Sequence, residues 1–240
     1  MKNVFITGVS RGLGLQILKD FLKEGWNIYC VSRSVPPELK DILINHNNVK
    51  HLVYDLENSQ GIKSLICKDF ISNNIPIHAC VHNSAMAYDD IITNLDLNKM
   101  NKMMNVNVLS VMMINKYIIR NMLYNKINGS IVHISSISAS TGFKGLAMYA
   151  STKGCIDSFF NNLSREWGSR GIRSNCVVPG FMETDMTNSL TTEQKKKIYN
   201  RTSLKESTDI SSVSETVLFL CSEKSRSITG QKIFVDGGVI

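Results

Sequence analysis

Residues 3–14 read Asn3-Val4-Phe5-Ile6-Thr7-Gly8-Val9-Ser10-Arg11-Gly12-Leu13-Gly14, and this stretch decides the fold of the chain. Its apolar start predicts a buried strand, and its three glycines predict a turn into a helix. Glycines in such a turn let the backbone approach a pyrophosphate, which the free N–H groups and the dipole of the helix stabilise. A glycine-rich turn can also be only a tight connection, so the pattern needs support from the rest of the chain.

Short apolar runs alternate with amphipathic stretches along most of the sequence, which is typical of a parallel sheet with helices on both faces. Because no repeat, linker or low-complexity segment interrupts this alternation, we predict a single α/β domain over residues 1–240 with a doubly wound, seven-stranded sheet. The predicted strands lie near 2–7, 27–32, 49–54, 77–82, 130–135, 172–178 and 232–236. The predicted helices lie near 13–24, 37–45, 59–73, 96–124, 148–169 and 209–222.

The composition is that of an ordinary folded protein, with 43% hydrophobic and 20% charged residues among 240. No stretch approaches the ~18 uncharged apolar residues of a membrane span, and the N-terminal apolar run is too short for a signal sequence, so we expect a cytoplasmic protein. The formal charge is +7, but lysine and arginine are dispersed and no base-reading motif accompanies them. Nucleic-acid binding is therefore not expected.

The cysteines form no Cys-x-x-Cys pair and no cluster with histidine at metal-binding spacing. We expect reduced thiols that pack as small apolar side chains, and no metal site. The six positions are Cys30, Cys67, Cys80, Cys155, Cys176 and Cys221.

Polar residues at the ends of predicted strands indicate how a dinucleotide would be held. A basic residue after the second strand accommodates a ribose 2′-phosphate, whereas an acidic one accepts from the 2′-hydroxyl. The chain has Arg33 there and Arg11 in the first turn, which favours NADPH; the alternative is two solvated surface arginines. Asp55 after the third strand is a candidate for the adenine amino group or an exposed turn residue. The candidate cofactor-binding residues up to this point are Gly8, Ser10, Arg11, Gly12, Leu13, Gly14, Arg33, Asp55, Leu56, Asn83, Ser84 and Ala85.

Tyr149 and Lys153 stand four residues apart at the start of a predicted helix, so their side chains share one face. A neighbouring ammonium lowers the pKa of a phenol from about 10 toward neutrality, which makes the pair a candidate proton donor. Ser136, at the end of the fifth predicted strand, adds a hydroxyl that can hydrogen-bond an oxygen becoming negative. Because a Tyr-x-x-x-Lys spacing also arises by chance, the surrounding pattern has to support it.

The predicted helix at 96–124 is rich in methionine, which suits either a pliable binding surface or, as we favour, a core and subunit-interface helix. Within it Asn107 is a polar residue in apolar company, and a buried asparagine needs partners.

His133, in the fifth strand, is interpreted as a packed or satisfied histidine rather than a general base. Residues 181–206 form a long polar connection, which predicts a substrate lid. Lys195–Lys197 within it either attract an acidic carrier or form a solvated helix face.

The order and spacing of these residues resemble the short-chain dehydrogenase/reductase family across essentially the whole chain. The resemblance implies a single Rossmann-type domain, a nicotinamide cofactor, and a homotetramer built on the helices at 96–124 and 148–169. It also implies catalysis by Asn107, Ser136, Tyr149 and Lys153, in which Tyr149 donates the proton, Lys153 holds the nicotinamide ribose and Asn107 holds a water. The matching features are Thr7 with Gly8 through Gly14, Asp55, segment 82–85, the four catalytic positions, and Pro179-Gly180 followed by Thr184. Family members bind the cofactor at positions matching Tyr149, Lys153, Pro179, Gly180, Met182 and Thr184.

Within the family, residues 179–187 and the ending Val235-Asp236-Gly237-Gly238 are most similar to 3-oxoacyl-(acyl carrier protein) reductases. This implies reduction of 3-oxoacyl thioesters on acyl carrier protein in fatty acid biosynthesis. The alternatives are a reductase of sugars, polyketides or small carbonyls, and a catalytically silent NADPH-binding sensor.

Two positions depart from the family pattern. His82-Asn83-Ser84-Ala85 replaces Asn-Asn-Ala-Gly and adds a methyl group at Ala85. Of two basic carrier-docking positions expected beside the active-site entrance, Arg170 matches one, whereas Ile127, next to Lys126, stands at the other.

Overall fold

Seven parallel strands form one sheet in the computed structural model, which describes residues 1–184 and 191–240. The strand order is β3-β2-β1-β4-β5-β6-β7, so the predicted doubly wound sheet is confirmed. All seven predicted strands are present, although β4 begins two residues later than predicted. Their bounds are β1 Asn3–Thr7, β2 Asn27–Ser32, β3 Val49–Val53, β4 Ala79–His82, β5 Ser130–Ile134, β6 Arg173–Pro179 and β7 Lys232–Val235.

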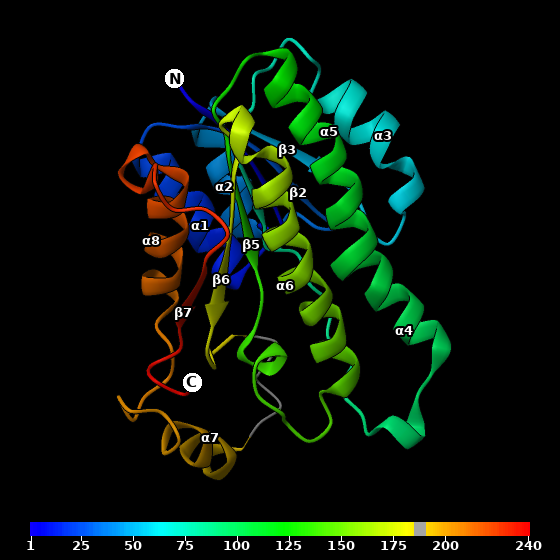
Figure 1. Cartoon of the computed structure of the whole chain (residues 1–240), viewed down its shortest axis with the longest axis vertical. Coiled ribbons are helices and arrows are strands. Elements are labelled where there is room, and N and C mark those ends of the chain that lie inside the picture. The colour runs from blue at the N-terminus through cyan, green and yellow to red at the C-terminus, as the bar shows by residue number, and fades with distance from the viewer. Residues whose placement is uncertain (185–190) are drawn as a thin grey trace.

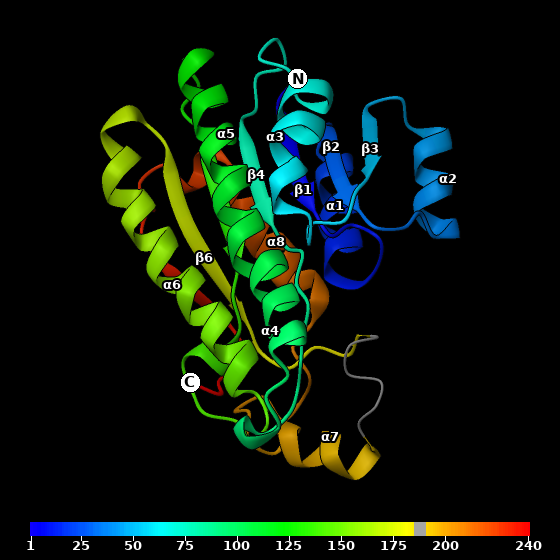
Figure 2. The same ribbon diagram turned by 90° about the vertical axis from the view of Figure 1, so that its right-hand side faces the viewer.

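Helices cover both faces of this sheet, as Figures 1 and 2 show. α1 (Gly12–Lys23) packs beside α8 (Ile210–Cys221) on one face. The other face carries α5 (Ser110–Tyr124), which continues α4 (Leu97–Met104), and α6 (Ala147–Trp167). The remaining helices are α2 (Pro37–Asn45), the short α3 (Ile62–Ser64) and α7 (Thr192–Tyr199).

Two hydrophobic cores follow from the alternation of side chains along β1. Val4 and Ile6 point into the core shared with α1 and α8. Phe5 points the other way, into the core shared with α5 and α6. Because successive strand residues face opposite sides, one continuous apolar run fills both layers. This explains why the buried strands were predictable as unbroken apolar segments.

Three helical segments differ from the prediction. The segment predicted as a helix at 59–73 contains only the short α3, flanked by a 3₁₀ turn at 59–61 and a π-helical turn, Leu65–Phe70. The helix predicted at 96–124 contains a π-helical turn at Asn105–Leu109, between α4 and α5. The third, α7, was not predicted because it buries no side chain and so lacks an apolar periodicity.

No helix in the described part of the chain is long and apolar enough to cross a bilayer. All six cysteines are free, and four of them are buried. Among residues 1–184 and 191–240, no group of three His, Cys, Asp or Glu side chains is placed to hold a metal ion.

Candidate active site

The glycine-rich turn after β1 is packed too tightly for larger residues at Gly8 and Gly14. Gly8 has a φ of +78°, its N–H donates to the carbonyl of Val31 at 2.7 Å, and its carbonyl accepts from Asn83 Nδ2 at 2.9 Å. A Cβ atom on Gly14 would lie 1.9 Å from the Gly8 carbonyl oxygen. Only glycine fits position 14, which keeps the start of α1 close to the turn.

Thr7 joins this turn to the segment that follows β4. Its Oγ1 accepts hydrogen bonds from the backbone N–H groups of Asn83 and Ser84, each at 3.1 Å. The structure therefore brings Asn83 and Ser84 against the glycine turn, as the candidate cofactor site requires. The sequence shows Thr7 only as part of the motif, and its role as the acceptor for two N–H groups follows from the pairing of β1 with β4.

The segment after β6 completes this edge of the sheet. Gly180 donates to the carbonyl of Val235 at 2.9 Å. Further along, the Thr184 methyl group lies 3.7 Å from the position of a Cβ built on Gly12. The glycine turn and the residues after Pro179 thus face each other. Residues 185–187, which belong to the motif, and the rest of the lid up to 190 lie outside the described residues.

The other candidate cofactor residues differ in how far their side chains are exposed to solvent. Arg11 and Arg33 are exposed at the sheet edge. Asp55 is exposed and its Oδ1 accepts from the Glu57 N–H at 3.0 Å, so it also closes a turn. Leu13 and Leu56 are buried in the two cores.

Tyr149 and Lys153 share one face of α6, as predicted. Lys153 Nζ lies 5.7 Å from the centre of the Tyr149 ring and donates to the carbonyl of Ile134 at 2.8 Å. The Lys153 side chain is buried, and burial lowers its pKa to about 8, while the nearby Cys176 and Asp157 act to raise that pKa. Lys153 therefore carries its charge at neutral pH and loses it in mildly alkaline solution.

The expected lowering of the Tyr149 pKa is wrong for this structure. Burial raises the pKa of the phenol, the charge of Asp89 raises it further, and hydrogen bonding with Ser136 lowers it. The ammonium of Lys153 is directed to a backbone carbonyl. Spacing along a helix predicts that two side chains are neighbours, but the direction of a pKa shift depends on burial and on charges from other segments.

Ser136 lies two residues beyond β5, at the start of a 3₁₀ turn. Its Oγ accepts from the Ser138 N–H at 3.2 Å and from the Ser138 hydroxyl at 3.0 Å. Both contacts with Ser138 use Ser136 Oγ as the acceptor, and on the other side Ser136 hydrogen-bonds the Tyr149 hydroxyl. Ser138 was not singled out in the sequence, where nothing distinguishes it from its neighbouring serines.

Asn107 lies in the π-helical turn between α4 and α5 and is 2% exposed. Its Oδ1 accepts from the Met86 N–H at 2.8 Å, and its Nδ2 donates to the Met86 carbonyl at 2.8 Å and to Thr152 Oγ1 at 3.0 Å. Both Nδ2 protons of Asn107 are thus donated in hydrogen bonds. The prediction that a buried Asn107 has partners is confirmed, whereas its proposed water is not tested.

Asp89 is a residue near the site that the sequence analysis missed. It follows Tyr88, and its neighbour Asp90 donates from its N–H to the carbonyl of Gly145 at 2.9 Å, which ties the loop to the start of α6. The carboxylate of Asp89 is the charge that raises the pKa of Tyr149. No motif marks it, because its proximity to Tyr149 arises only when the loops after β4 and β5 meet.

Within one chain, Arg170 and Lys126 do not lie beside Tyr149. Arg170 follows α6, at the opposite end from Tyr149. With 21 residues, α6 separates the two by about 30 Å. Lys126 and Ile127 line a cavity of about 480 Å³ with Gly168 and Gly171 at this far edge.

His133 is packed but not satisfied. Its ring stacks on His82 with centroids 5.0 Å apart, and neither ring nitrogen has a partner in the described part of the chain. Burial holds the pKa of His133 well below its ordinary value. The ring is therefore neutral and fully buried, which makes it unsuited to act as a general base.

Comparison with known proteins decides the family. A family model described as "Enoyl-(Acyl carrier protein) reductase" matches residues 8–240, nearly the whole chain. The chain belongs to the short-chain dehydrogenase/reductase family. It is accordingly an oxidoreductase of the class that interconverts CH–OH and C=O groups.

Relatives and solved structures match this chain over nearly its full length. The 3-oxoacyl-[acyl-carrier-protein] reductase FabG of Buchnera aphidicola is 32% identical over 241 residues, which cover 99% of this chain and 97% of the relative. The structure of ElxO with NADP bound has a TM-score of 0.87 at 26% identity and covers 99% of this chain and 98% of its own. A 4-hydroxyisoleucine dehydrogenase complexed with NADH has a TM-score of 0.94 and covers 100% of this chain and 98% of its own; at 22% identity it shows the fold alone.

Proposed function

We propose that this short-chain dehydrogenase/reductase uses NADPH to reduce 3-oxoacyl thioesters on acyl carrier protein to 3-hydroxyacyl thioesters, a step of fatty acid biosynthesis. The observation that carries the proposal is the placement of buried Lys153 beside the Tyr149 ring, at the sheet edge that also holds the glycine turn. The similarity to FabG supports the substrate class.

The residues at the sheet edge fit a nicotinamide dinucleotide. The turn from Gly8 to Gly14 brings backbone N–H groups at the start of α1 to the edge, where a pyrophosphate can approach them. Arg11 and Arg33 would contact a 2′-phosphate, and the bound NADP of ElxO supports this choice. Asn83, Ser84 and Ala85, the segment Pro179–Thr184 and the ammonium of Lys153 would hold the rest of the cofactor. When bound, NADPH supplies the hydride that the carbonyl carbon receives.

The protein's own residues handle the proton and the carbonyl oxygen. Ser136 donates its hydroxyl proton in a hydrogen bond to the substrate oxygen. Because burial raises the pKa of Tyr149, the phenol stays protonated at neutral pH and is ready to protonate the same oxygen as the alcohol forms. The charged Lys153 then stabilises the tyrosinate, and Asn107 keeps the loop at Met86 in place.

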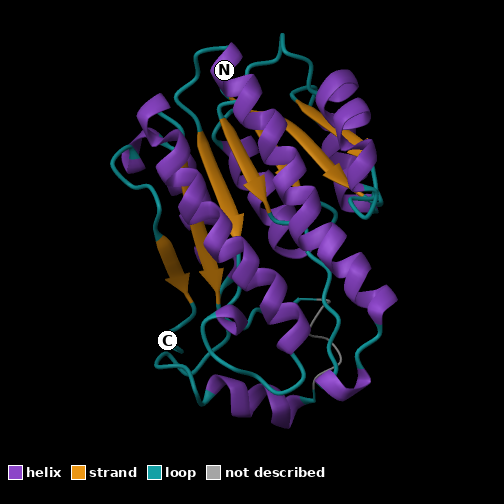
Figure 3. Ribbon diagram, turned by 45° about the vertical axis from the view of Figure 1, so that its right-hand side comes forward, coloured by secondary structure: helices purple, strands orange, loops and turns teal. Residues whose placement is uncertain are grey.

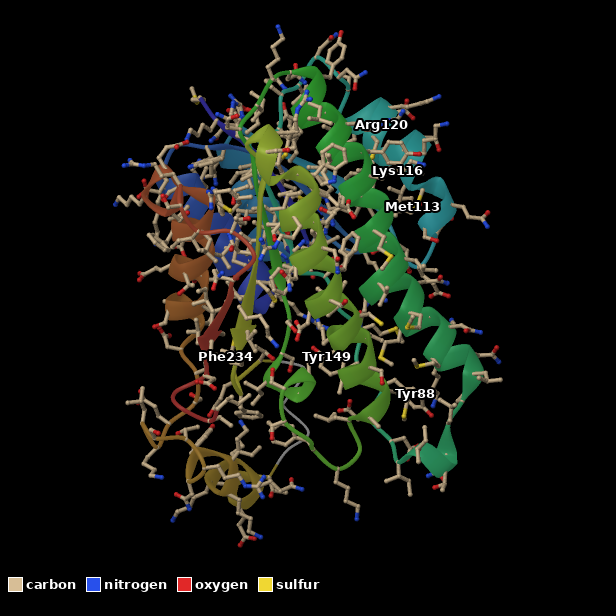
Figure 4. The ribbon with its side chains drawn as sticks, in the orientation of Figure 1. Tyr88, Met113, Lys116, Arg120, Tyr149 and Phe234 are labelled. Atoms are coloured by element: carbon tan, nitrogen blue, oxygen red, sulfur yellow. The ribbon has the colours of Figure 1, made fainter. Side chains whose placement is uncertain are left out.

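A second candidate is a reductase of a sugar, polyketide or small carbonyl in another pathway. The observation that favours it is Ile127, an apolar residue where a basic docking position was expected. No observation favours a silent sensor, since Asn107, Ser136, Tyr149 and Lys153 are all retained. We further propose a homotetramer that uses the helix faces of α4 to α6. Lys116 and Arg120 point outward from α5 in Figure 4, and both are exposed.

The test is an NADPH-oxidation assay with acetoacetyl-carrier protein and with an acetoacetyl thioester of N-acetylcysteamine. The proposal expects turnover of both, with a lower KM for the carrier-bound form. Equal KM values would favour the second candidate, and no turnover with any carbonyl would remove the proposal. We also expect NADPH to bind at least about tenfold more tightly than NADH, or about 1.4 kcal/mol. Arg33→Ala should reduce that difference without weakening NADH binding.

A further inference from the structure

Lys232, at the start of β7, lies where three segments of the chain meet, although no motif marks it. Its Nζ donates to Asp157 Oδ2 on α6 at 2.7 Å and to Ser140 Oγ at 2.9 Å. Ser140 directly follows the 3₁₀ turn at 137–139, which begins after Ser136. One ammonium group thus joins the last strand, the helix that carries Tyr149, and the turn that carries Ser136.

Several groups hold this ammonium in place. The pairing of β6 with β7 sets Lys232 opposite Cys176, whose Sγ also donates to the Asp157 carboxylate, at 3.7 Å. The side chains of Lys232 and Asp157 are 30% and 14% exposed. Lys232 Nζ also lies 5.4 Å from the centre of the Phe234 ring. Because these contacts already order the lysine side chain, its bond to Ser140 costs little further conformational entropy.

The hydrogen bonds inside the serine turn fix its shape rather than its position. The Ala139 N–H donates to the Ser136 carbonyl at 3.0 Å, and the Ser140 N–H donates to the Ile137 carbonyl at 2.9 Å. The side chain of Ile137 is buried in a cluster with Phe160 of α6, but apolar contact is non-directional and tolerates small shifts. The bond from β7 therefore adds a directional link between the turn and α6.

Charge neutralisation explains only one of the two contacts that the ammonium makes. A lysine that served only to balance Asp157 would have no need to reach the serine turn. The carboxylate of Asp157 is also one of the charges that act on buried Lys153 and raise its pKa. Asp157 thus faces Lys153 on one side and Lys232 on the other, so the contacts of Lys232 connect both halves of the candidate active site.

We propose that Lys232 is a positioning residue that keeps Ser136 aligned with Tyr149 and Lys153 by tying the serine turn to α6. The reason lies in the carbonyl–alcohol interconversion of the family. A serine hydroxyl bonds the substrate oxygen most strongly when that oxygen becomes negative. A displaced Ser136 therefore loses more stabilisation in the transition state than in the bound substrate, and kcat falls while KM stays nearly constant.

Lys232→Met and Ser140→Ala each remove one end of the link. The kinetic assay rests on the proposed function and uses acetoacetyl-N-acetylcysteamine at pH 7, where a pKa of about 8 keeps Lys153 charged. We expect kcat to fall about three- to tenfold in both variants, with KM and the Kd for NADPH within about twofold of the wild type. The double variant should lose no more than Lys232→Met alone, because both changes act through one bond. Lys2→Met is the matched control, since Lys2 pairs with Glu223 at 3.0 Å before the start of β1, and its kcat should be unchanged.

Hydrogen exchange of segment 137–141 measures the link without any substrate. We expect faster exchange of these backbone amides in Lys232→Met and Ser140→Ala, and wild-type exchange in Lys2→Met. Exchange that is unchanged in the first two variants would overturn the proposal, and so would faster exchange with an unchanged kcat or with a raised KM alone.

The two proposals fail in different ways. If the wild type reduces the thioester but the variants match it in kcat, the role of Lys232 is refuted and the proposed function stands. If the wild type does not reduce the thioester, the proposed substrate is refuted, and the exchange of segment 137–141 alone decides whether Lys232 holds the serine turn.

Discussion

The side-chain amide of Asn107 donates a 3.0 Å hydrogen bond to the hydroxyl of Thr152, the residue directly before Lys153. The same carboxamide bonds both backbone polar groups of Met86. One buried side chain thus fixes the loop after β4 against the helix that carries Tyr149 and Lys153. The π-helical turn at Asn105–Leu109 places Asn107 where it can reach both partners.

Replacing Asn107 with leucine should therefore lower both stability and turnover. The substitution leaves the N–H and C=O of Met86 without their partner, and we expect a loss of at least about 2 kcal/mol in the free energy of unfolding. Urea denaturation measures this loss. Asn115→Leu is the control for removing a buried asparagine, since Asn115 donates to the Val111 carbonyl of its own helix and hydrogen-bonds the His82 side chain. Equal losses for the two variants would contradict a special role for Asn107.

Tyr149→Phe should remove turnover while leaving NADPH binding nearly intact. The phenylalanine keeps the ring beside Lys153 but lacks the proton that the product oxygen needs, so we expect a rate lower by about 10²–10⁴-fold or more. Cofactor titration and NADPH oxidation measure the two properties. Tyr88→Phe is the matched control, because the Tyr88 hydroxyl bonds the backbone of Asn94 and Asp96 within its own loop. Activity retained in Tyr149→Phe would refute the catalytic assignment.

The pKa of Lys153 predicts how the rate of carbonyl reduction falls at alkaline pH, which is the alkaline limb of the pH–rate profile. Its pKa is about 8, with burial as the main cause of the lowering, so the ammonium is charged below that pH and neutral above it. If charged Lys153 stabilises the tyrosinate, the rate of carbonyl reduction falls as the pH rises through about 8. The groups that face Lys153 are Tyr149 on α6, His133 on β5, Cys176 on β6 and Asp157 one turn further along α6.

Asp157→Asn tests this interpretation. Asp157 acts to raise the pKa of Lys153, so its removal should move the alkaline limb to lower pH. Lys232→Met is the control: Lys232 pairs with Asp157 at 2.7 Å, and its loss keeps the carboxylate and should not move the limb to lower pH. A limb unchanged by Asp157→Asn would show that another group controls it.

Gly14→Ala should prevent stable folding, because its methyl group would overlap the Gly8 carbonyl oxygen and lie 2.4 Å from Asn83 Nδ2. We expect a loss of about 3 kcal/mol or more in unfolding free energy. Gly154→Ala is the control: a methyl group there meets no atom within 4 Å, and alanine stabilises a helix by up to about 1 kcal/mol over glycine. Thermal unfolding of both variants measures the contrast. Similar melting temperatures for the two variants would show that the glycine turn shifts to accommodate the added methyl group.

The sheet and the proximity of Tyr149 to Lys153 could be predicted because each depends on a local sequence pattern. Strands buried on both faces read as unbroken apolar runs, as in Val4–Ile6. The four-residue spacing of Tyr149 and Lys153 places them on one face of any helix. By contrast, α7 has no apolar face, and the π-helical turn at Asn105–Leu109 leaves no mark on the spacing of apolar residues, so neither was predicted.

By itself, the sequence determined the α/β fold, the glycine turn and the residue types of the candidate site, because short-range periodicity and steric demands act within a few residues. Only the tertiary structure decided which distant groups meet. It brought Asp89 close enough to raise the pKa of Tyr149, turned the ammonium of Lys153 to the Ile134 carbonyl, and put Arg170 at the opposite end of α6 from Tyr149. Burial, electrostatic influence and distance across a sheet depend on how separate segments pack, and no spacing along the chain encodes them.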